Sequence, residues 1–288
     1  MMVNTIPGPD FSDRTWSNWV EPQFVDVDGL PTAYRRAGSG PTLVYLHPGG
    51  GTRSWPSFPD ALSKNFDVIA PEHPGFGDTA RPANIDSWPD FVLHYDAFFR
   101  ALGLENFHLV GSSFGAWIAA NLAIYYPERY ASLTLITPLG TRIEDEPFID
   151  VFRFSGEEDF EAVFNGRGAA LLPELAQGSM LETAITNFYE STTAALLFFN
   201  PRYDYKLDVR LQRVQVPTLV VGVEDDRIAG NLQAARFHQL IPGSDLITIP
   251  GPDGQPSAHG VVFEQPGDVA TVIVDYVASK ALTQEVTV

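Results

Sequence analysis

A serine flanked by glycines at two-residue spacing is the clearest chemical signal in this sequence. The pentapeptide Gly111-Ser112-Ser113-Phe114-Gly115 has the pattern G-x-S-x-G and lies between a short apolar run and a helical pattern that begins at Phe114. Such a strand-to-helix turn is so sharp that side chains two residues before and after the serine would collide with the backbone. The helix N-terminus also favours developing negative charge. The spacing therefore predicts Ser113 as a nucleophile, with Ser112, which is not midway between the glycines, as the alternative.

A serine hydroxyl is a poor nucleophile at neutral pH and needs a base beside it. The chain has six histidines. His94 and His108 lie inside a predicted helix and a predicted strand, and His238 lies in a helical stretch, so we expect these three to be structural or on the surface. His259 lies in a loop rich in Gly, Pro and Ser after the last predicted strand. The sequence therefore predicts His259 as the base.

A base histidine needs a third group that fixes its tautomer and stabilises the imidazolium. Asp225 and Asp226 lie in an acidic turn after the predicted strand 218–223. We predict Asp226 as the acid, but a shift of one residue would exchange it with Asp225, and the turn could also be a solvated acidic loop. A further arrangement would take the acid from Glu144 or Asp145, after an earlier strand.

Six short motifs follow one another along the chain, namely residues 46–51 (LHPGGG), 73–77 (HPGFG), 111–115 (GSSFG), 216–221 (VPTLVV), 224–227 (EDDR), and His259 with Glu264 and Pro266. In this order they resemble the α/β-hydrolase family over nearly the whole length of the chain. The resemblance implies a serine hydrolase with the triad in the order Ser, acid, His. Val223 stands where relatives usually have Gly, which leaves the register around the acidic turn open.

The resemblance also implies where the negative charge of a tetrahedral intermediate is received. Each hydrogen-bond donor to that oxygen is worth about 3 kcal/mol. One donor would be the amide of Phe114, directly after the nucleophile. The second would come from the glycine-rich loop, where Pro48 departs from the usual His-Gly pair. Proline has no amide hydrogen, so Gly49 or Gly50 must donate, and we prefer Gly49.

The elements that must position these residues alternate between strands and helices. Short continuous apolar runs are typical of strands covered on both faces, as in a parallel sheet. The predicted strands are 43–46, 66–70, 107–110, 133–136, 218–223 and 246–249, and the predicted helices are 55–64, 88–102, 114–126 and 266–282. Residues 23–27 and 32–36 flank Asp28-Gly29 and predict a hairpin at one edge. The fold class is therefore α/β, a mostly parallel, doubly wound sheet of the α/β-hydrolase type.

Residues 140–211 interrupt this alternation, since they contain helical patterns and Gly/Pro breaks but no convincing strand. We predict a core domain of residues 1–139 and 212–288 and a helical lid of residues 140–211, inserted after the sixth predicted strand. Most aromatic side chains of the lid would pack against each other and the core. The remainder would line an apolar substrate pocket, for which we predict His47, Trp117, Phe148, Phe152 and Phe188.

Composition limits the partners. The formal net charge of −18 repels phosphate backbones and anionic membranes, so we expect neither nucleic-acid nor membrane partners. Cysteine is absent, which excludes disulfides and thiolate catalysis and is expected in a reducing cytoplasm. The sequence has no signal-peptide pattern, no stretch of about 20 apolar residues, no metal-ligand cluster and no phosphate loop. We expect a cytoplasmic protein without cofactors that acts on a small hydrophobic molecule, and a homodimer stays open.

Three functions fit these residues. The first is hydrolysis of a carboxylic ester or lactone through an acyl-enzyme on Ser113. The second is hydrolysis of a carbon–carbon bond in a vinylogous diketone by the same triad, although many such relatives carry Trp directly after the histidine, where this chain has Gly260. The third is a non-catalytic small-molecule receptor on the same fold. Relatives that hydrolyse haloalkanes or epoxides use Asp as nucleophile, so Ser113 disfavours both.

Overall fold

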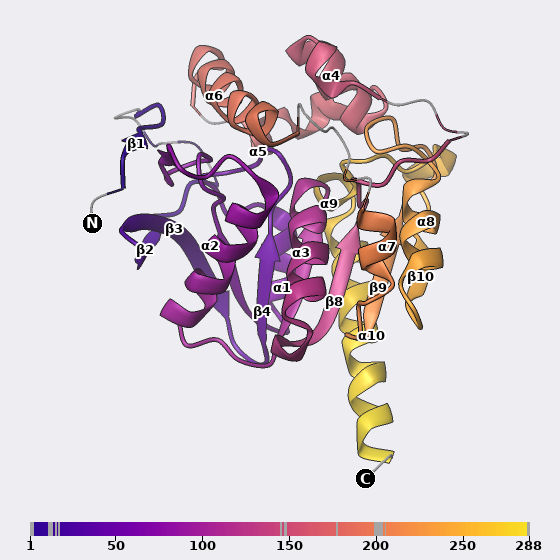
Figure 1. Ribbon diagram of the computed structural model, residues 1–288. Helices are drawn as coiled ribbons and strands as arrows, with labels where there is room; N and C mark the ends of the chain where they lie inside the picture. The colour runs from indigo at the N-terminus through magenta and orange to yellow at the C-terminus, as the bar shows by residue number, and fades with distance from the viewer. Residues whose placement is uncertain are drawn as a thin grey trace.

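A central sheet organises the molecule (Figure 1). The computed structural model describes residues 3–286 except 11–13, 15, 17, 145, 147–148, 177, 199–203 and 205. Within these residues the main sheet has eight strands in the order β10-β9-β8-β7-β4-β5-β3-β2. In chain order they are β2 (Gln23–Val27), β3 (Leu30–Gly38), β4 (Thr42–Leu46), β5 (Asp67–Pro71), β7 (Phe107–Ser112), β8 (Tyr130–Ile136), β9 (Thr218–Gly222) and β10 (Asp245–Thr248).

The sheet is mostly parallel, as predicted. Strand β3 pairs antiparallel with β2 and β5, whereas the pairs from β5 through β10 are parallel. The predicted hairpin joins β2 to β3, and its turn residues Asp28 and Gly29 both have positive φ, 54° and 89°, as a two-residue hairpin turn requires. The structure also contains a two-residue pair, β1 (Thr5–Ile6) with β6 (Arg81–Pro82), which is too short to give a periodic signal in the sequence.

Helices cover both faces of the sheet. The helices of the described residues are α1 (Ser57–Ser63), α2 (Trp88–Ala101), α3 (Phe114–Tyr125), α4 (Gly156–Phe164), α5 (Leu172–Leu175), α6 (Met180–Phe198), α7 (Leu207–Leu211), α8 (Gln233–Leu240), α9 (Val261–Glu264) and α10 (Pro266–Val286), with short 3₁₀ turns η1 (Pro127–Arg129), η2 (Val151–Arg153), η3 (Gly168–Leu171) and η4 (Pro252–Gly254). None of these described helices has the length and apolarity to cross a membrane.

Two apolar cores lie on opposite faces of the sheet, because successive residues of a strand point to opposite sides. In β4, Val44 and Leu46 join a core formed with α2, α3, α7 and α8. Leu43 and Tyr45 join the other core, which is formed with α1, α9 and α10. Burial on both faces explains why the strands read as continuous apolar runs.

The chain between β8 and β9 contains helices and no strand in its described part, in agreement with the pattern of residues 140–211. Helices α4 and α6 lie beyond the carboxyl ends of the parallel strands, at the top of Figure 1. Helix α7 lies elsewhere: Leu207 and Leu211 are fully buried in the same core as α3 and α8. The end of the segment thus packs with the sheet domain, and the division into core and lid stays a prediction.

Candidate active site

The turn between β7 and α3 holds Ser113 in an unusual backbone conformation, with φ 53° and ψ −115°. A side-chain Cβ at Gly111 would lie 2.3 Å from the carbonyl oxygen of Gly115, and one at Gly115 would lie 2.1 Å from the carbonyl oxygen of Leu46. Both distances are far inside van der Waals contact, so both positions of the motif require glycine. The amide of Ser113 donates to the carbonyl of Ile136 on β8 (2.9 Å), which ties the strained turn to the sheet.

The structure brings Ser113, His259 and Asp226 together. The Oγ of Ser113 lies 2.7 Å from Nε2 of His259, and Nδ1 of His259 lies 2.9 and 3.0 Å from the two carboxylate oxygens of Asp226. All three side chains are buried. Since a carboxylate can only accept, Nδ1 carries the proton and Nε2 is free to accept the serine proton. The arrangement can therefore activate the hydroxyl.

The two neighbouring aspartates have different partners. Oδ1 of Asp226 also accepts from the amides of Ile228 (3.0 Å) and Ala229 (2.7 Å), so this carboxylate is held in place on the loop after β9. The carboxylate of Asp225 instead pairs with Arg227 at 2.8 Å and accepts from Asn165 at 3.2 Å. The geometry thus places Asp226, and not Asp225, beside His259. The sequence also offered Glu144 or Asp145, after β8, as the acid, and Asp145 lies outside the described residues.

The glycine-rich loop after β4 has open space around its centre. A Cβ built at Gly49 or Gly50 meets no atom within 4 Å. The ring of His47 fixes the start of this loop, because its Nδ1 donates to the carbonyl of Pro48 (2.6 Å). In a trans peptide the carbonyl and the following N–H point in opposite directions, so the amide of Gly49 is directed away from the His47 ring. This orientation is compatible with Gly49 as a donor.

A second histidine supports His47. The amide of His73 donates to Nε2 of His47 (3.1 Å), and Nε2 of His73 donates to the carbonyl of His47 (2.8 Å). Nδ1 of His73 therefore accepts, and its partner is the hydroxyl of Tyr95. Burial lowers the pKa of His47 to about 4 and lowers the pKa of His73 well below its usual value. Both rings are neutral at neutral pH and hold the loop by hydrogen bonds.

The structure places the aromatic residues predicted for the pocket in different surroundings. Trp117 is fully buried beneath the site and stacks on Trp88 with ring centroids 4.0 Å apart, so it is a core residue and not a pocket wall. Phe188 is 75% exposed on the outer face of α6, so it does not line the site. Phe152 packs against the core from a half-buried position, and Phe148 lies outside the described residues. Apolar spacing alone could not tell which face of each helix is buried.

Helix α4 closes over the loop that carries His259. The amide of Gly260 donates to the carbonyl of Val163 (2.8 Å), and a Cβ at Gly260 would lie 2.3 Å from the ring of Phe164. Arg167 makes a bidentate pair with Glu264, at 2.9 and 3.1 Å. Helix α4 and the residues just after it are therefore fastened to the sheet domain next to the imidazole of His259.

Two carboxylates of the lid were not singled out from the sequence. Burial raises the pKa of Asp159 on α4, while the nearby His259 lowers it, so this carboxyl lies within electrostatic range of the imidazole. Glu190 on α6 is buried, and burial raises its pKa to about 7. Neither lies in a recognisable motif, and only the packing of the lid reveals them. Across the described part of the chain, no group of three or more His, Cys, Asp or Glu side chains could hold a metal ion.

Known proteins share both the sequence pattern and the fold. A family model described as the α/β-hydrolase fold matches residues 41–253. The chain belongs to the α/β-hydrolase family. The fold class predicted from the sequence is confirmed, and the family and its hydrolase relatives make this α/β-hydrolase a hydrolytic enzyme.

Two curated relatives of this α/β-hydrolase cover most of its length. It is 25% identical to the 2-hydroxy-6-oxo-6-(2'-aminophenyl)hexa-2,4-dienoic acid hydrolase of Metapseudomonas resinovorans, over 94% of this chain and 95% of that protein. It is 26% identical to monoacylglycerol lipase ABHD6 of Mus musculus, over 85% of this chain and 77% of that protein. The names of these relatives give different substrates, so they support hydrolysis without naming the substrate of this chain.

Solved structures show the same fold. A meta-cleavage product hydrolase of Pseudomonas fluorescens superimposes with a TM-score of 0.75 at 24% identity, covering 89% of this chain and 97% of its own. The naproxen esterase of Bacillus subtilis gives a TM-score of 0.71 at 20% identity, covering 93% and 99%. At these identities the likeness concerns the fold.

Proposed function

We propose that this α/β-hydrolase cleaves a carboxylic ester or lactone with a hydrophobic moiety through an acyl-enzyme on Ser113. The observation that carries the proposal is the continuous path from the Ser113 hydroxyl to Nε2 of His259 (2.7 Å) and from Nδ1 to Asp226 (2.9 Å). A base oriented by a buried carboxylate is the arrangement that serine nucleophiles need.

The chemistry follows from this geometry. Ser113 Oγ attacks the carbonyl carbon as its proton passes to Nε2 of His259. The amides of Phe114 and of Gly49 or Gly50 receive the charge on the carbonyl oxygen. The imidazolium then gives its proton to the departing alcohol, which leaves an ester on Ser113. A water molecule, deprotonated by His259, attacks this ester, and the acid and the free serine are released.

The surroundings of the triad favour an uncharged substrate over a strongly anionic one. Ser113, His259 and Asp226 are all buried, and burying a second negative charge beside Asp226 is costly. An apolar acyl or alcohol portion suits this buried setting.

Hydrolysis of a carbon–carbon bond in a vinylogous diketone is the second candidate. The similarity to the Metapseudomonas resinovorans dienoic acid hydrolase over 94% of this chain favours it. One observation counts against it: many such relatives carry Trp directly after the histidine, whereas this chain has Gly260, where even a Cβ would lie 2.3 Å from the ring of Phe164.

A panel of short p-nitrophenyl esters, lactones and a ring-cleavage diketone tests these alternatives. We expect ester or lactone turnover by the wild type and a loss of about 10⁵-fold or more in kcat for Ser113→Ala. Equal rates for both proteins would remove Ser113 from the mechanism. Turnover of the diketone alone would favour the second candidate. Failure of a fluorophosphonate to label Ser113 would support a non-catalytic receptor.

A further inference from the structure

The buried face of helix α6 is mostly polar. Among the described side chains of this helix, the buried ones are Thr186, Glu190, Thr193 and Ala194, which lie on one face at spacings of three and four residues. Glu190 is only 1% exposed. A buried carboxyl group is costly unless hydrogen-bond donors meet it, so the protein beneath α6 must supply them.

The donors come from two loops of the sheet domain. Oε1 of Glu190 accepts from the hydroxyl of Thr52 (2.5 Å), in the loop after β4. The same oxygen accepts from the amide of Gly77 (2.9 Å), in the loop after β5. One side chain of the lid thus connects to both loops.

Thr52 directly follows the three glycines that we expect to carry an oxyanion donor. A Cβ at Gly49 or Gly50 would meet nothing within 4 Å, so the two ends of the loop contribute to the placing of these amides. The first end is held by the bond from His47 to the carbonyl of Pro48. The second end is Thr52 with Arg53, so the bond to Glu190 bears on the position of the glycines.

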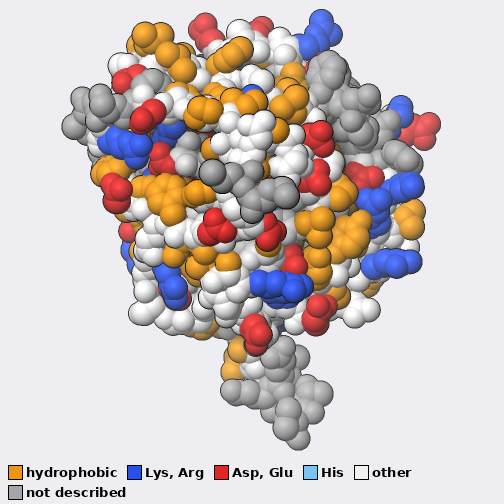
Figure 2. All heavy atoms as spheres, turned by 60° about the vertical axis from the view of Figure 1, so that its left-hand side comes forward, with side chains coloured by type: hydrophobic (Ala, Val, Ile, Leu, Met, Phe, Trp, Pro, Cys, Tyr) orange, Lys and Arg blue, Asp and Glu red, His pale blue; other side chains and the backbone are white. Residues whose placement is uncertain are grey.

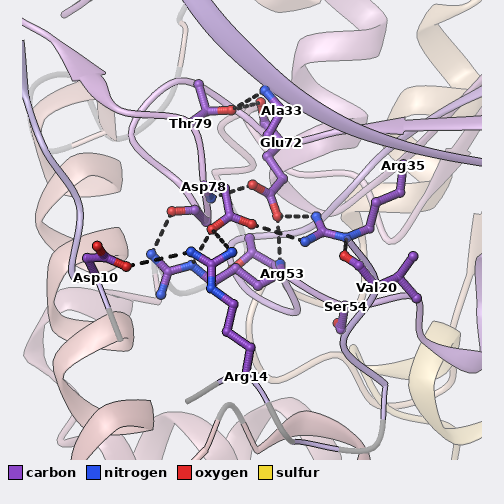
Figure 3. Close-up of polar contacts among 12 residues, drawn as sticks. Asp10, Arg14, Val20, Ala33, Arg35, Arg53, Ser54, Glu72, Asp78 and Thr79 are labelled. Atoms are coloured by element: carbon purple, nitrogen blue, oxygen red, sulfur yellow. Dashed lines mark hydrogen bonds and ion pairs between the residues drawn. The ribbon is translucent and has the colours of Figure 1, made fainter. Parts of the chain in front are cut away.

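A buried ion network holds Arg53, the next residue (Figure 3). Arg53 has a positive φ of 55°, and its amide donates to Oε1 of Glu72 (2.7 Å). Its Nε lies 3.3 Å from Asp78, and Arg35 of β3 bonds both Glu72 (2.6 Å) and Asp78 (3.1 Å). Arg53 and Glu72 are also the charged groups that act electrostatically on Glu190. The network holds Arg53 from within the sheet domain, whereas Thr52 is bonded to the lid.

We propose that Glu190 is a positioning residue: from the lid it holds Thr52 and thereby sets the amides of Gly49 and Gly50 where the oxyanion forms. This inference rests on the proposed function. Closure of α6 and completion of the oxyanion site would then be one event, because the same hydrogen bond serves both.

The test compares Thr52→Val with a matched control, Thr193→Val. Thr193 lies on α6, the helix that carries Glu190, and its hydroxyl donates to the carbonyl of Gly75 (3.1 Å). Loss of this hydroxyl also removes a hydrogen bond between α6 and the sheet domain, but it leaves Thr52 unchanged. For Thr52→Val we expect kcat on a p-nitrophenyl ester to fall about tenfold with KM within about twofold, because a displaced donor weakens only the transition state. Thr193→Val should keep its kcat.

A boronic acid gives a readout that does not depend on turnover. Its tetrahedral adduct with Ser113 places an oxygen where the oxyanion would form, so its affinity should fall in Thr52→Val by the same factor as kcat. Glu190→Leu should show the same losses. Glu190→Gln, which keeps an oxygen for Thr52, should recover most of both quantities.

Thermal unfolding establishes that each variant is folded. A folded Thr52→Val with wild-type kcat and boronate affinity would overturn the proposal, as would a loss confined to KM or equal losses in Thr193→Val. A wild type that neither hydrolyses esters nor reacts with a fluorophosphonate would overturn the proposed function itself, and this inference with it, before any variant is compared.

Discussion

At the scale of single residues, the hydrogen-bond partners of each carboxylate determine which of them can orient His259. Asp226 uses one oxygen for the amides of Ile228 and Ala229 and still reaches Nδ1 of His259. Asp225, one residue earlier, is occupied by Arg227 and Asn165. Two adjacent carboxylates thus have separate roles, since one orients the imidazole and the other fastens the loop to the lid.

Asp226→Asn should therefore lower kcat by about 10⁴-fold, because an amide no longer selects the tautomer with a free Nε2. Asp225→Asn is the matched control, and its kcat should stay within about tenfold of the wild type. Steady-state ester hydrolysis at neutral pH measures both. The reverse order of effects would assign the acid to Asp225.

At the level of elements, α6 departs from the usual amphipathic helix. Several of its large apolar residues are exposed, among them Met180, Leu181, Ile185, Phe188 and Leu196. Figure 2 shows apolar side chains reaching the surface at the top of the molecule. The inward face is polar because it must meet the backbone and hydroxyl groups of loops, and not the apolar side of another helix.

The buried carboxyl group of α6 makes stability depend on pH. Burial raises the pKa of Glu190 from 4.5 to about 7. Between these values the folded protein keeps a proton that the unfolded chain has lost, so the free energy of unfolding falls as pH rises, by about 3 kcal/mol in all. Urea unfolding of both proteins at pH 4.5 and pH 8 tests this. From the lower to the higher pH, the free energy of unfolding of Glu190→Gln should rise relative to that of the wild type by about this amount. Parallel pH dependences of the two proteins would contradict the prediction.

On the scale of the whole molecule, helices α4 and α6 are joined to the sheet domain at both sides of the site. Helix α4 contacts the His259 loop through Val163 and Phe164, and Arg167, just after this helix, pairs with Glu264 of α9. Helix α6 contacts the loops after β4 and β5 through Glu190 and Thr193.

The attachment of α4 depends on the absence of a side chain at residue 260. The φ of Gly260 is −75°, so the backbone would accept alanine, but its Cβ would meet Phe164 at 2.3 Å. We expect Gly260→Ala to lower the free energy of unfolding by about 1–3 kcal/mol through overpacking. Thermal and urea unfolding measure this cost.

The control is Phe164→Ala, alone and combined with Gly260→Ala. With the ring removed, the added methyl group should cost less than about 0.5 kcal/mol, so the two changes should not be additive. A Gly260→Ala protein as stable as the wild type would show that the lid does not press on this loop.

The sequence by itself determined the features that depend on near neighbours. The turn at Ser113 requires Gly111 and Gly115 because their backbones approach atoms a few residues away or on the adjoining strand. The apolar runs identified the parallel strands because both faces of the sheet are covered. The fold class and the family followed from such local signals taken in order, and the same signals singled out Ser113 and His259, whereas Asp225 stayed open beside Asp226.

Only the tertiary structure decided which side of each element faces the site. Trp117 and Phe188 both read as pocket residues, but one is in the core and the other faces solvent. The hydrogen bond between Thr52 and Glu190 joins residues 138 positions apart, and no sequence pattern in either segment predicts it. Such choices depend on how distant elements pack, because the buried face of a helix is set by its partner and not by its own spacing alone.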